Sequence, residues 1–366
     1  MSDRSFTPAF ISFKALSGWL RALAQKATVH APRREGRAVV YRELGDGQGL
    51  ESFLRPTESA KHVLFPRSEA LFSFQRQGEA AGAASGKIRL QEPEGEGPAI
   101  IFGALSCDAR GFLSFDPVYD GCGTAQAVGG IAKDPYYLRR RANTSIIVRA
   151  CKSALNTCFC HWVGGGPAST EGADLLATDL EGGLLLSPCS EAGAALLEHP
   201  DCVPALPEQI AAAAALHAAA ERSLGEAPPA GELAASRAAL LALFENSEFW
   251  QRQSAQCLSC GACTYLCPTC YCFNITDESN GIAGARLRSW DSCMSALFTL
   301  EASGHNPRAA KAARLKNRVG HKFSYYPAIH EGRFSCCGCG RCIKSCPSSV
   351  DIRKIVLAAI KEAAHV

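Results

Sequence analysis

The sequence lacks the features that define several large protein classes. No run approaches the roughly 18 consecutive apolar residues of a membrane-spanning helix, so we expect no membrane span. The formal net charge of the 366 residues is only +3, which is too small to argue for nucleic acid as a partner. With 47% hydrophobic and 20% charged residues, the composition is that of an ordinary globular chain.

Signals for export and for catalysis are also missing. Asp3, Lys14 and Arg21 interrupt the apolar residues of the N-terminus, and no small-residue cleavage site follows them. We therefore expect a cytoplasmic protein whose thiols stay reduced. The sequence contains no Walker-type phosphate loop, no H-E-x-x-H zinc motif and no recognisable catalytic triad. We predict no catalytic residue and no independent catalytic site on this chain.

Cysteine is abundant, but it is distributed unevenly. The chain has 19 cysteines, none of them in the first 106 residues, and 12 of them fall between residues 257 and 346. Many cysteines in a reducing compartment indicate metal or redox chemistry rather than disulfide bonds.

Apolar periodicity divides the chain into three parts. Apolar residues at helical spacing predict an opening helix over 12–26, and a second helix is expected over 134–141. Short apolar runs between Gly and Pro predict strands at 38–41, 87–90, 99–104, 145–149, 174–178 and 183–186. The alanine-rich stretch that follows, broken by Pro228-Pro229, predicts two helices. We predict an α+β protein with a mixed α/β domain at 1–205, a helical connector at 206–249 and a cysteine-rich domain at 250–366.

Two cysteine runs with the same spacing carry the chemistry. Each run reads C-x2-C-x2-C-x3-C-P, the pattern of bacterial ferredoxins that hold [4Fe-4S] clusters. In two-cluster ferredoxins the fourth cysteine of each run ligates the other cluster, because one tight loop cannot surround a whole cubane. We therefore predict one cluster held by Cys257, Cys260, Cys263 and Cys346, and a second held by Cys336, Cys339, Cys342 and Cys267. Zinc, which usually takes two C-x2-C pairs, fits this spacing poorly.

The 68 residues between the runs are more than a compact ferredoxin needs. The segments GARLRSWDSCMSALFTLEASG and NPRAAKAARLKNRV read as helical. We therefore predict an α-helical ferredoxin-type domain with two [4Fe-4S] clusters and an inserted helical segment.

At these motifs the chain resembles a known family. QCLSCGACTYLCPTCYCFNITD, RSWDSC and CCGCGRCIKSCP are similar to the iron–sulfur subunit of anaerobic sulfite reductases and to the β subunit of cytosolic sulfhydrogenases. The resemblance continues in FGALSCDARGF, DPYYLRRR and CKSALNTCFC, and so covers most of residues 60–366. One departure is Leu105-Ser106, where an Arg-Pro pair is expected before Cys107.

The resemblance implies a metal-binding electron-transfer subunit in anaerobic metabolism. Such subunits relay electrons between a flavoprotein that oxidises NAD(P)H and a terminal reductase or hydrogenase of the sulfite reductase, sulfhydrogenase or heterodisulfide reductase type. FAD is then expected on the partner subunit. The alternative is a catalytic subunit whose α/β domain binds flavin or reduces a sulfur substrate at an open cluster site.

The other cysteines form a second possible group. Cys107 and Cys151 each follow a predicted strand, and strand ends meet at one sheet edge where ligands usually bind. Together with Cys158 and Cys160 they are candidates for a third [4Fe-4S] cluster, with Asp108 as a substitute ligand; the alternative is that they are buried packing residues. Packing is also our expectation for the lone or neighbouring thiols, namely Cys189, Cys202, Cys270, Cys272, Cys293 and Cys337.

One segment between the runs is rich in cations and free of acids. From Arg308 to Lys322 it carries six basic residues, with Arg308, Lys311 and Arg314 three apart. Either this is a solvated helix face, or it lies beside anionic clusters or an acidic partner.

Overall fold

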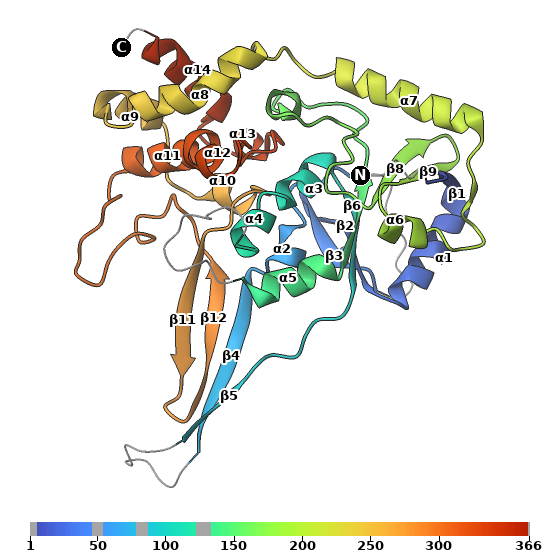
Figure 1. Cartoon of the computed structure of the whole chain (residues 1–366), viewed down its shortest axis with the longest axis horizontal. Helices are drawn as coiled ribbons and strands as arrows, with labels where there is room; N and C mark the ends of the chain where they lie inside the picture. The colour runs from blue at the N-terminus through green and yellow to red at the C-terminus, as the bar shows by residue number, and fades with distance from the viewer. Residues whose placement is uncertain (1–5, 46–53, 78–86, 122–132, 365–366) are drawn as a thin grey trace.

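The computed structural model describes residues 6–45, 54–77, 87–121 and 133–364 (Figure 1). An eight-stranded sheet forms the centre of the N-terminal half, in the order β10-β1-β9-β8-β7-β6-β2-β3. The bounds of its strands are β1 Ala9–Ser12, β2 Thr28–Glu35, β3 Ala38–Glu43, β6 Ala99–Ala104, β7 Thr144–Arg149, β8 Leu175–Leu180, β9 Gly183–Pro188 and β10 Val203–Pro204. Strands β2, β6, β7 and β8 run parallel to their neighbours within this group, and the flanking pairs are antiparallel.

Both faces of the parallel strands are buried, which explains their nearly continuous apolar runs. On one face, Ile100 and Phe102 of β6 pack with Trp19 of α1 (Phe13–Ala24). On the other face, Ile101 packs with Phe112 and other apolar residues of short helices. The helices of the N-terminal half besides α1 are α2 Lys61–Leu64, α3 Ser106–Phe112, α4 Asp116–Tyr119, α5 Pro135–Ala142, α6 Glu191–Ala195 and the 3-10 turn η1 Cys160–Val163. The predicted strands and both predicted helices of this half are confirmed, each within a few residues.

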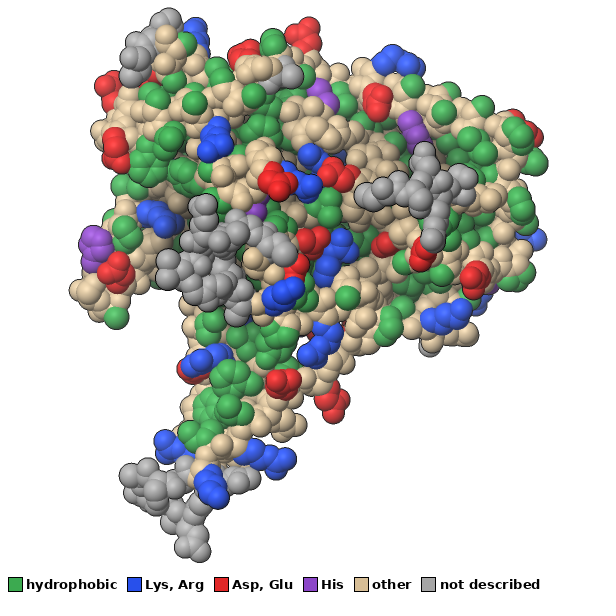
Figure 2. Space-filling view, viewed as in Figure 1, with side chains coloured by type: hydrophobic (Ala, Val, Ile, Leu, Met, Phe, Trp, Pro, Cys, Tyr) green, Lys and Arg blue, Asp and Glu red, His purple; other side chains and the backbone are tan. Residues whose placement is uncertain are grey.

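A second sheet projects from the body as an arm (Figure 1). Its strands, in spatial order, are β11 Phe273–Ser279, β12 Ala283–Trp290, β4 Ser68–Gln77 and β5 Lys87–Gln91. Apolar side chains lie along the arm and basic ones lie toward its far end (Figure 2). The central pairing joins β12 to β4, so the arm is built from two distant parts of the chain.

The arm corrects one sequence prediction. GARLRSW was expected to be helical, but it forms β12 in a hairpin with β11, and the residues after it form turns. Pairing with β4 satisfies the backbone of β12 along most of its length, and such tertiary contacts outweigh the weak helical preference of the segment. The cysteine-rich part is therefore not purely helical, and the proposed domain division stays a prediction.

Helices complete the C-terminal half. They are α7 Pro207–Arg222, α8 Ala230–Ala242, α9 Ser247–Ser254, α10 Ala262–Tyr265, α11 Lys311–Gly320, the π-helical turn η2 His321–Tyr325, α12 Tyr326–Ile329, α13 Arg341–Lys344 and α14 Ile352–Ala363. The two helices predicted on either side of Pro228-Pro229 are confirmed as α7 and α8. A separate apolar core joins α8, α9, α11 and α14 around the cysteine runs. Among the described residues, none of the helices combines the length and apolar character needed to cross a membrane.

Candidate metal centres

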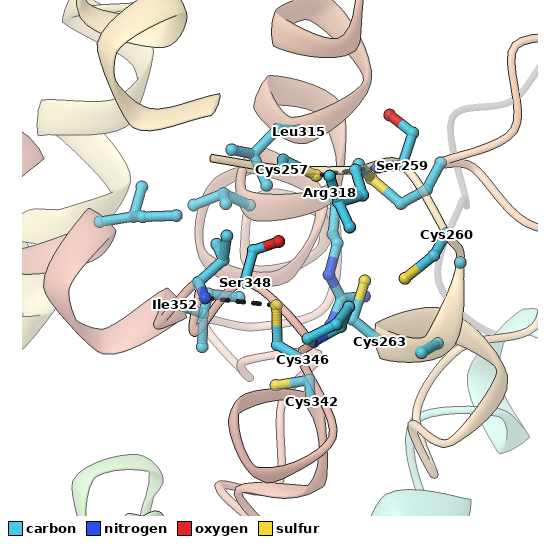
Figure 3. Close-up of a pocket in the computed structure, with 18 residues that line it drawn as sticks. Cys257, Ser259, Cys260, Cys263, Leu315, Arg318, Cys342, Cys346, Ser348 and Ile352 are labelled. Carbon is cyan, nitrogen blue, oxygen red and sulfur yellow. Dashed lines mark hydrogen bonds between the residues drawn. The ribbon is translucent and has the colours of Figure 1, made fainter. Parts of the chain in front are cut away.

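The first cysteine run lines an internal pocket together with the end of the second run (Figure 3). The pocket has about 570 Å³ of space outside protein atoms. Its lining includes Cys257, Cys260, Cys263 and Cys346, the four residues predicted to hold one cluster. Cys342 and Arg318 also reach it, and the remaining wall is largely apolar: Met294, Leu315, Val319, Val350, Ile352 and Ile355.

Glycines with left-handed backbone shape both runs. Gly261 (φ +76°) precedes the four-residue helix α10, and Gly340 (φ +72°) precedes α13, so the two runs fold alike and their short helices touch. A Cβ at Gly340 would lie 2.2 Å from the carbonyl oxygen of Thr157, and one at Gly338 would lie 2.4 Å from that of Phe159. Only glycine allows the second run to approach the 157–160 loop this closely.

The second predicted group is also brought together. Cys267 and Cys336 are buried, and Cys339 and Cys342 are half-buried. Burial raises the pKa of the Cys336 thiol to about 11 and also raises that of Cys342, and the thiol of Cys267 adds to both shifts. Effects of this kind act between neighbouring groups, so they are consistent with thiols that lie near one another.

Two buried cations stand among these thiols. Lys322 Nζ donates to Cys267 Sγ at 3.4 Å, to Thr269 Oγ1 at 2.7 Å and to the Ser335 carbonyl at 2.8 Å. Burial lowers its pKa, yet the thiols of Cys267 and Cys270 outweigh burial and hold the pKa above the ordinary value. The pKa of Arg318 is raised in the same way, against burial, mainly by Cys263 and Cys270. No carboxylate forms an ion pair with either cation within the described ranges.

The buried cations and the backbone N–H groups around these thiols suit a site that holds a negatively charged iron–sulfur cluster. Arg318 donates through one nitrogen to Cys270 Sγ at 3.4 Å, while its buried Nη2 has no hydrogen-bond partner among the described residues. A buried charge is tolerated when it is paired, and a cluster with its thiolates would supply negative charge at this point. Backbone N–H groups also face two sulfurs, from Ser259 to Cys257 at 3.4 Å and from Val350 to Cys346 at 3.3 Å.

The thiols do not converge on a single position. In the part of the chain that the structure describes, no three His, Cys, Asp or Glu side chains are close enough to hold one metal ion.

The third group lies at the end of the parallel strands, as predicted. Cys107 is the second residue of α3, which follows β6 after one residue, and Cys151 follows β7. Burial raises the pKa of Cys151 and of Cys160 to about 12, and the Cys107 thiol is the next cause for both. Cys158 is close to the second run, with Sγ 4.0 Å from the Cys339 carbonyl oxygen.

Three observations tie this third group to the second. The neighbouring thiols of Cys107 and Cys339 raise the pKa of Cys337, which was expected to be a packing thiol, and burial adds to the shift. Asp108 is not available as a substitute ligand, because both of its carboxylate oxygens accept from buried Arg341, at 2.6 and 2.8 Å. The Phe159 N–H donates to the Gly338 carbonyl at 2.8 Å.

The cationic segment also differs from expectation. Helix α11 begins at Lys311, so Arg308 lies before it and the predicted three-residue alignment is wrong. The residues that turn inward are instead Arg314, Arg318 and Lys322, spaced four apart and all buried. That spacing and the missing acids were visible in the sequence, but cations usually face water, so the sequence alone left the inward face undecided.

The remaining thiols fall into two sets. Cys189 and Cys202 pack against the two cores of the α/β half. Cys272 and Cys293 are neighbours, and their interaction lowers the pKa of Cys272 to about 6 and raises that of Cys293.

Comparison with known proteins supports the cluster assignment at the level of the domain. Residues 256–350 match the family model described as a 4Fe-4S dicluster domain. The chain is 28% identical to sulfhydrogenase 2 subunit beta of Pyrococcus furiosus. The 337 aligned residues cover 91% of this chain and 92% of that protein. No solved structure matches the chain. The resemblance predicted from the cysteine motifs is thus confirmed: along almost its whole length the chain is similar to the β chain of a sulfhydrogenase, and it contains an iron–sulfur region of the 4Fe-4S dicluster type.

Proposed function

We propose that this chain is the electron relay of a cytoplasmic multisubunit oxidoreductase. It passes single electrons between a flavoprotein subunit that oxidises NAD(P)H and a terminal reductase or hydrogenase. Bound [4Fe-4S] clusters supply the one-electron chemistry, and the protein sets their potentials through hydrogen bonds, nearby charge and burial. FAD is placed on the partner subunit.

The pocket in Figure 3 is the observation that carries this proposal. Three of its cysteines come from the first run, and Cys342 and Cys346 come from the second, Cys346 lying 83 positions after Cys263. The meeting of the two runs in one pocket supports the crossed ligation of a two-cluster ferredoxin, in which the fourth cysteine of one run serves the cluster of the other. We accordingly assign Cys257, Cys260, Cys263 and Cys346 to the first cluster, and Cys336, Cys339, Cys342 and Cys267 to the second.

The buried cations support the same assignment. Arg318 lines the same pocket as Cys263 of the first set and Cys342 of the second, and thiols of both sets raise its pKa. A positive charge between two clusters stabilises their reduced, more negative forms, and so favours electrons on the relay.

A third cluster held by Cys107, Cys151, Cys158 and Cys160 would extend the relay into the α/β half. Its support is the clustering of these thiols at the ends of β6 and β7 and their contact with the second run through Cys337. Electrons would then cross the protein through three neighbouring sites in the order first, second, third.

Iron and sulfide analysis of anaerobically purified protein tests the number of clusters. We expect about 12 Fe per chain with three clusters, falling to about 8 in Cys151→Ser, whereas Cys202→Ser keeps the wild-type content. A wild-type value of about 8 Fe would remove the third cluster and leave the relay with two.

The crossed ligation is tested by Cys346→Ser. The variant should perturb the EPR signal of the cluster held by the first run, because Cys346 faces that pocket. If only the signal of the second run changes, the crossed assignment is wrong.

Activity separates this proposal from a catalytic subunit. The isolated chain should be reduced by dithionite but should not oxidise NAD(P)H without a partner. Unaided NADH or NADPH oxidation, or a bound flavin spectrum, would favour the catalytic alternative.

A further inference from the structure

One of the eight assigned ligands reaches the surface. Cys260 is exposed, whereas the other seven are buried or half-buried. Electron transfer between proteins requires close approach, because its rate falls steeply with distance. Of the two clusters assigned to these runs, the first therefore has the shorter path to solvent.

Exposed apolar side chains occur on the segment of Cys260 and on a segment that is linked to it. Leu258, two residues before Cys260, is 68% exposed, and Leu297 is 74% exposed. The two segments are held together through Arg314 and Asn306. Arg314 donates to Ser259 Oγ at 3.2 Å and to the carbonyls of 308 and 309, while Asn306 donates to the Ala296 carbonyl at 2.6 Å.

Basic residues border the same patch. Lys311 is exposed, and its Nζ donates to the Ala255 carbonyl at 2.7 Å and to the Cys257 carbonyl at 3.3 Å. Half-buried Arg308 follows the loop that carries Leu297. Glu301 lies at the end of that loop, and no Asp or Glu occurs from 302 to 330.

A groove close to these residues is also lined by apolar and basic side chains. It is lined by Leu241, Phe244, Pro307 and Tyr325 together with Arg308 and Lys316, and no carboxylate is among its lining residues. Lys316 Nζ lies 3.8 Å above the ring of Phe244. Arg308 lines this groove, and its carbonyl accepts from the same Arg314 that donates to Ser259, next to Cys260.

We propose that this surface, the Cys260 face, is the docking site of an acidic redox protein that exchanges electrons with the first cluster. The Cys260 face comprises Leu258, Cys260, Leu297, Arg308 and Lys311. The exposed leucines exclude water from the contact, and the cations attract and orient a partner with surplus Asp and Glu. The inference rests on the proposed function, because it needs a cluster behind Cys260.

Stopped-flow electron transfer tests the Cys260 face. The probe is a reduced acidic bacterial ferredoxin, mixed with the oxidised full-length chain. Attraction between opposite charges predicts a second-order rate that falls as salt rises from about 0.05 M to about 0.5 M. Lys311→Glu should slow the reaction about tenfold or more at low salt. Leu297→Asp should also slow it, because the new carboxylate must lose water in the contact and repels an acidic partner. Lys87→Glu makes the same charge change on β5 of the arm and should leave the rate unchanged.

Iron content and reduction by dithionite separate a failure of the docking site from a failure of the proposed function. Iron content and reduction by dithionite should be unchanged in Leu297→Asp, whose side chain is remote from the ligand loop in sequence and highly exposed. If Lys311→Glu loses iron, Leu297→Asp alone decides the question. Wild-type rates in Leu297→Asp, an absence of salt dependence, or equal slowing by Lys87→Glu would overturn the docking site. Absence of iron, or failure of dithionite to reduce the wild-type chain, would instead overturn the proposed function.

Discussion

Replacing Lys322 by methionine tests whether a buried charge sets the potential of the second cluster. The change keeps most of the side-chain volume but removes the positive charge whose Nζ lies 3.4 Å from Cys267 Sγ. Taking a separation of about 6 Å from the cluster centre and an effective dielectric constant of about 20, the attraction to one added electron is about 2.8 kcal/mol. Because about 1.4 kcal/mol corresponds to 59 mV for one electron, the potential should fall by about 120 mV.

A redox titration monitored by EPR measures this shift. Lys316→Met is the matched control, since Lys316 is on the neighbouring helix α11 but is half-buried and contacts Phe244 rather than a thiol. Screening by solvent should keep its shift below about 30 mV. A Lys322→Met protein with wild-type iron content and a potential within about 30 mV of wild type would refute the reasoning.

Three other perturbations have defined outcomes. Asp108→Asn leaves the buried guanidinium of Arg341 without its anionic partner and should cost about 3–5 kcal/mol in the free energy of unfolding, as read from denaturant titration. Gly340→Ala places a Cβ 2.2 Å from the Thr157 carbonyl and should lower the iron content; Gly304→Ala, also at positive φ but with open space around it, should keep its iron. Removal of iron by an anaerobic chelator should lower Tm in calorimetry, because Arg318 and its neighbours then lose their compensating charge; an unchanged Tm would argue against that pairing.

The local patterns of the sequence predicted those elements that depend on local interactions. The strands β6 and β7 are continuous apolar runs because helices bury both faces of the sheet, and a short window shows this. The cysteine runs are equally local, since one tight loop carries three ligands. The four cysteines assigned from their spacing to the first cluster all line the pocket of Figure 3, together with Cys342 of the second set.

Features that depend on distant contacts could not be predicted in this way. Strand β12 looked helical because its partner β4 is far away in sequence, and no short window contains both. Cys337 looked like a packing thiol because Cys107, whose thiol raises its pKa, belongs to the other half of the chain. The inward face of α11 was ambiguous for a related reason: cations usually face water unless a buried anion compensates them.

The pairing of β4 with β12 also constrains how the protein is made. Ser68 and Ser289, which share a hydrogen bond across these strands, are 221 residues apart. During synthesis β4 therefore leaves the ribosome long before its central neighbour, and one of its edges stays open until most of the chain exists. Open strand edges are templates for aggregation. We expect fragments that end before residue 283 to be poorly soluble, so the α/β half should be obtainable in native form only when the iron–sulfur half is expressed with it.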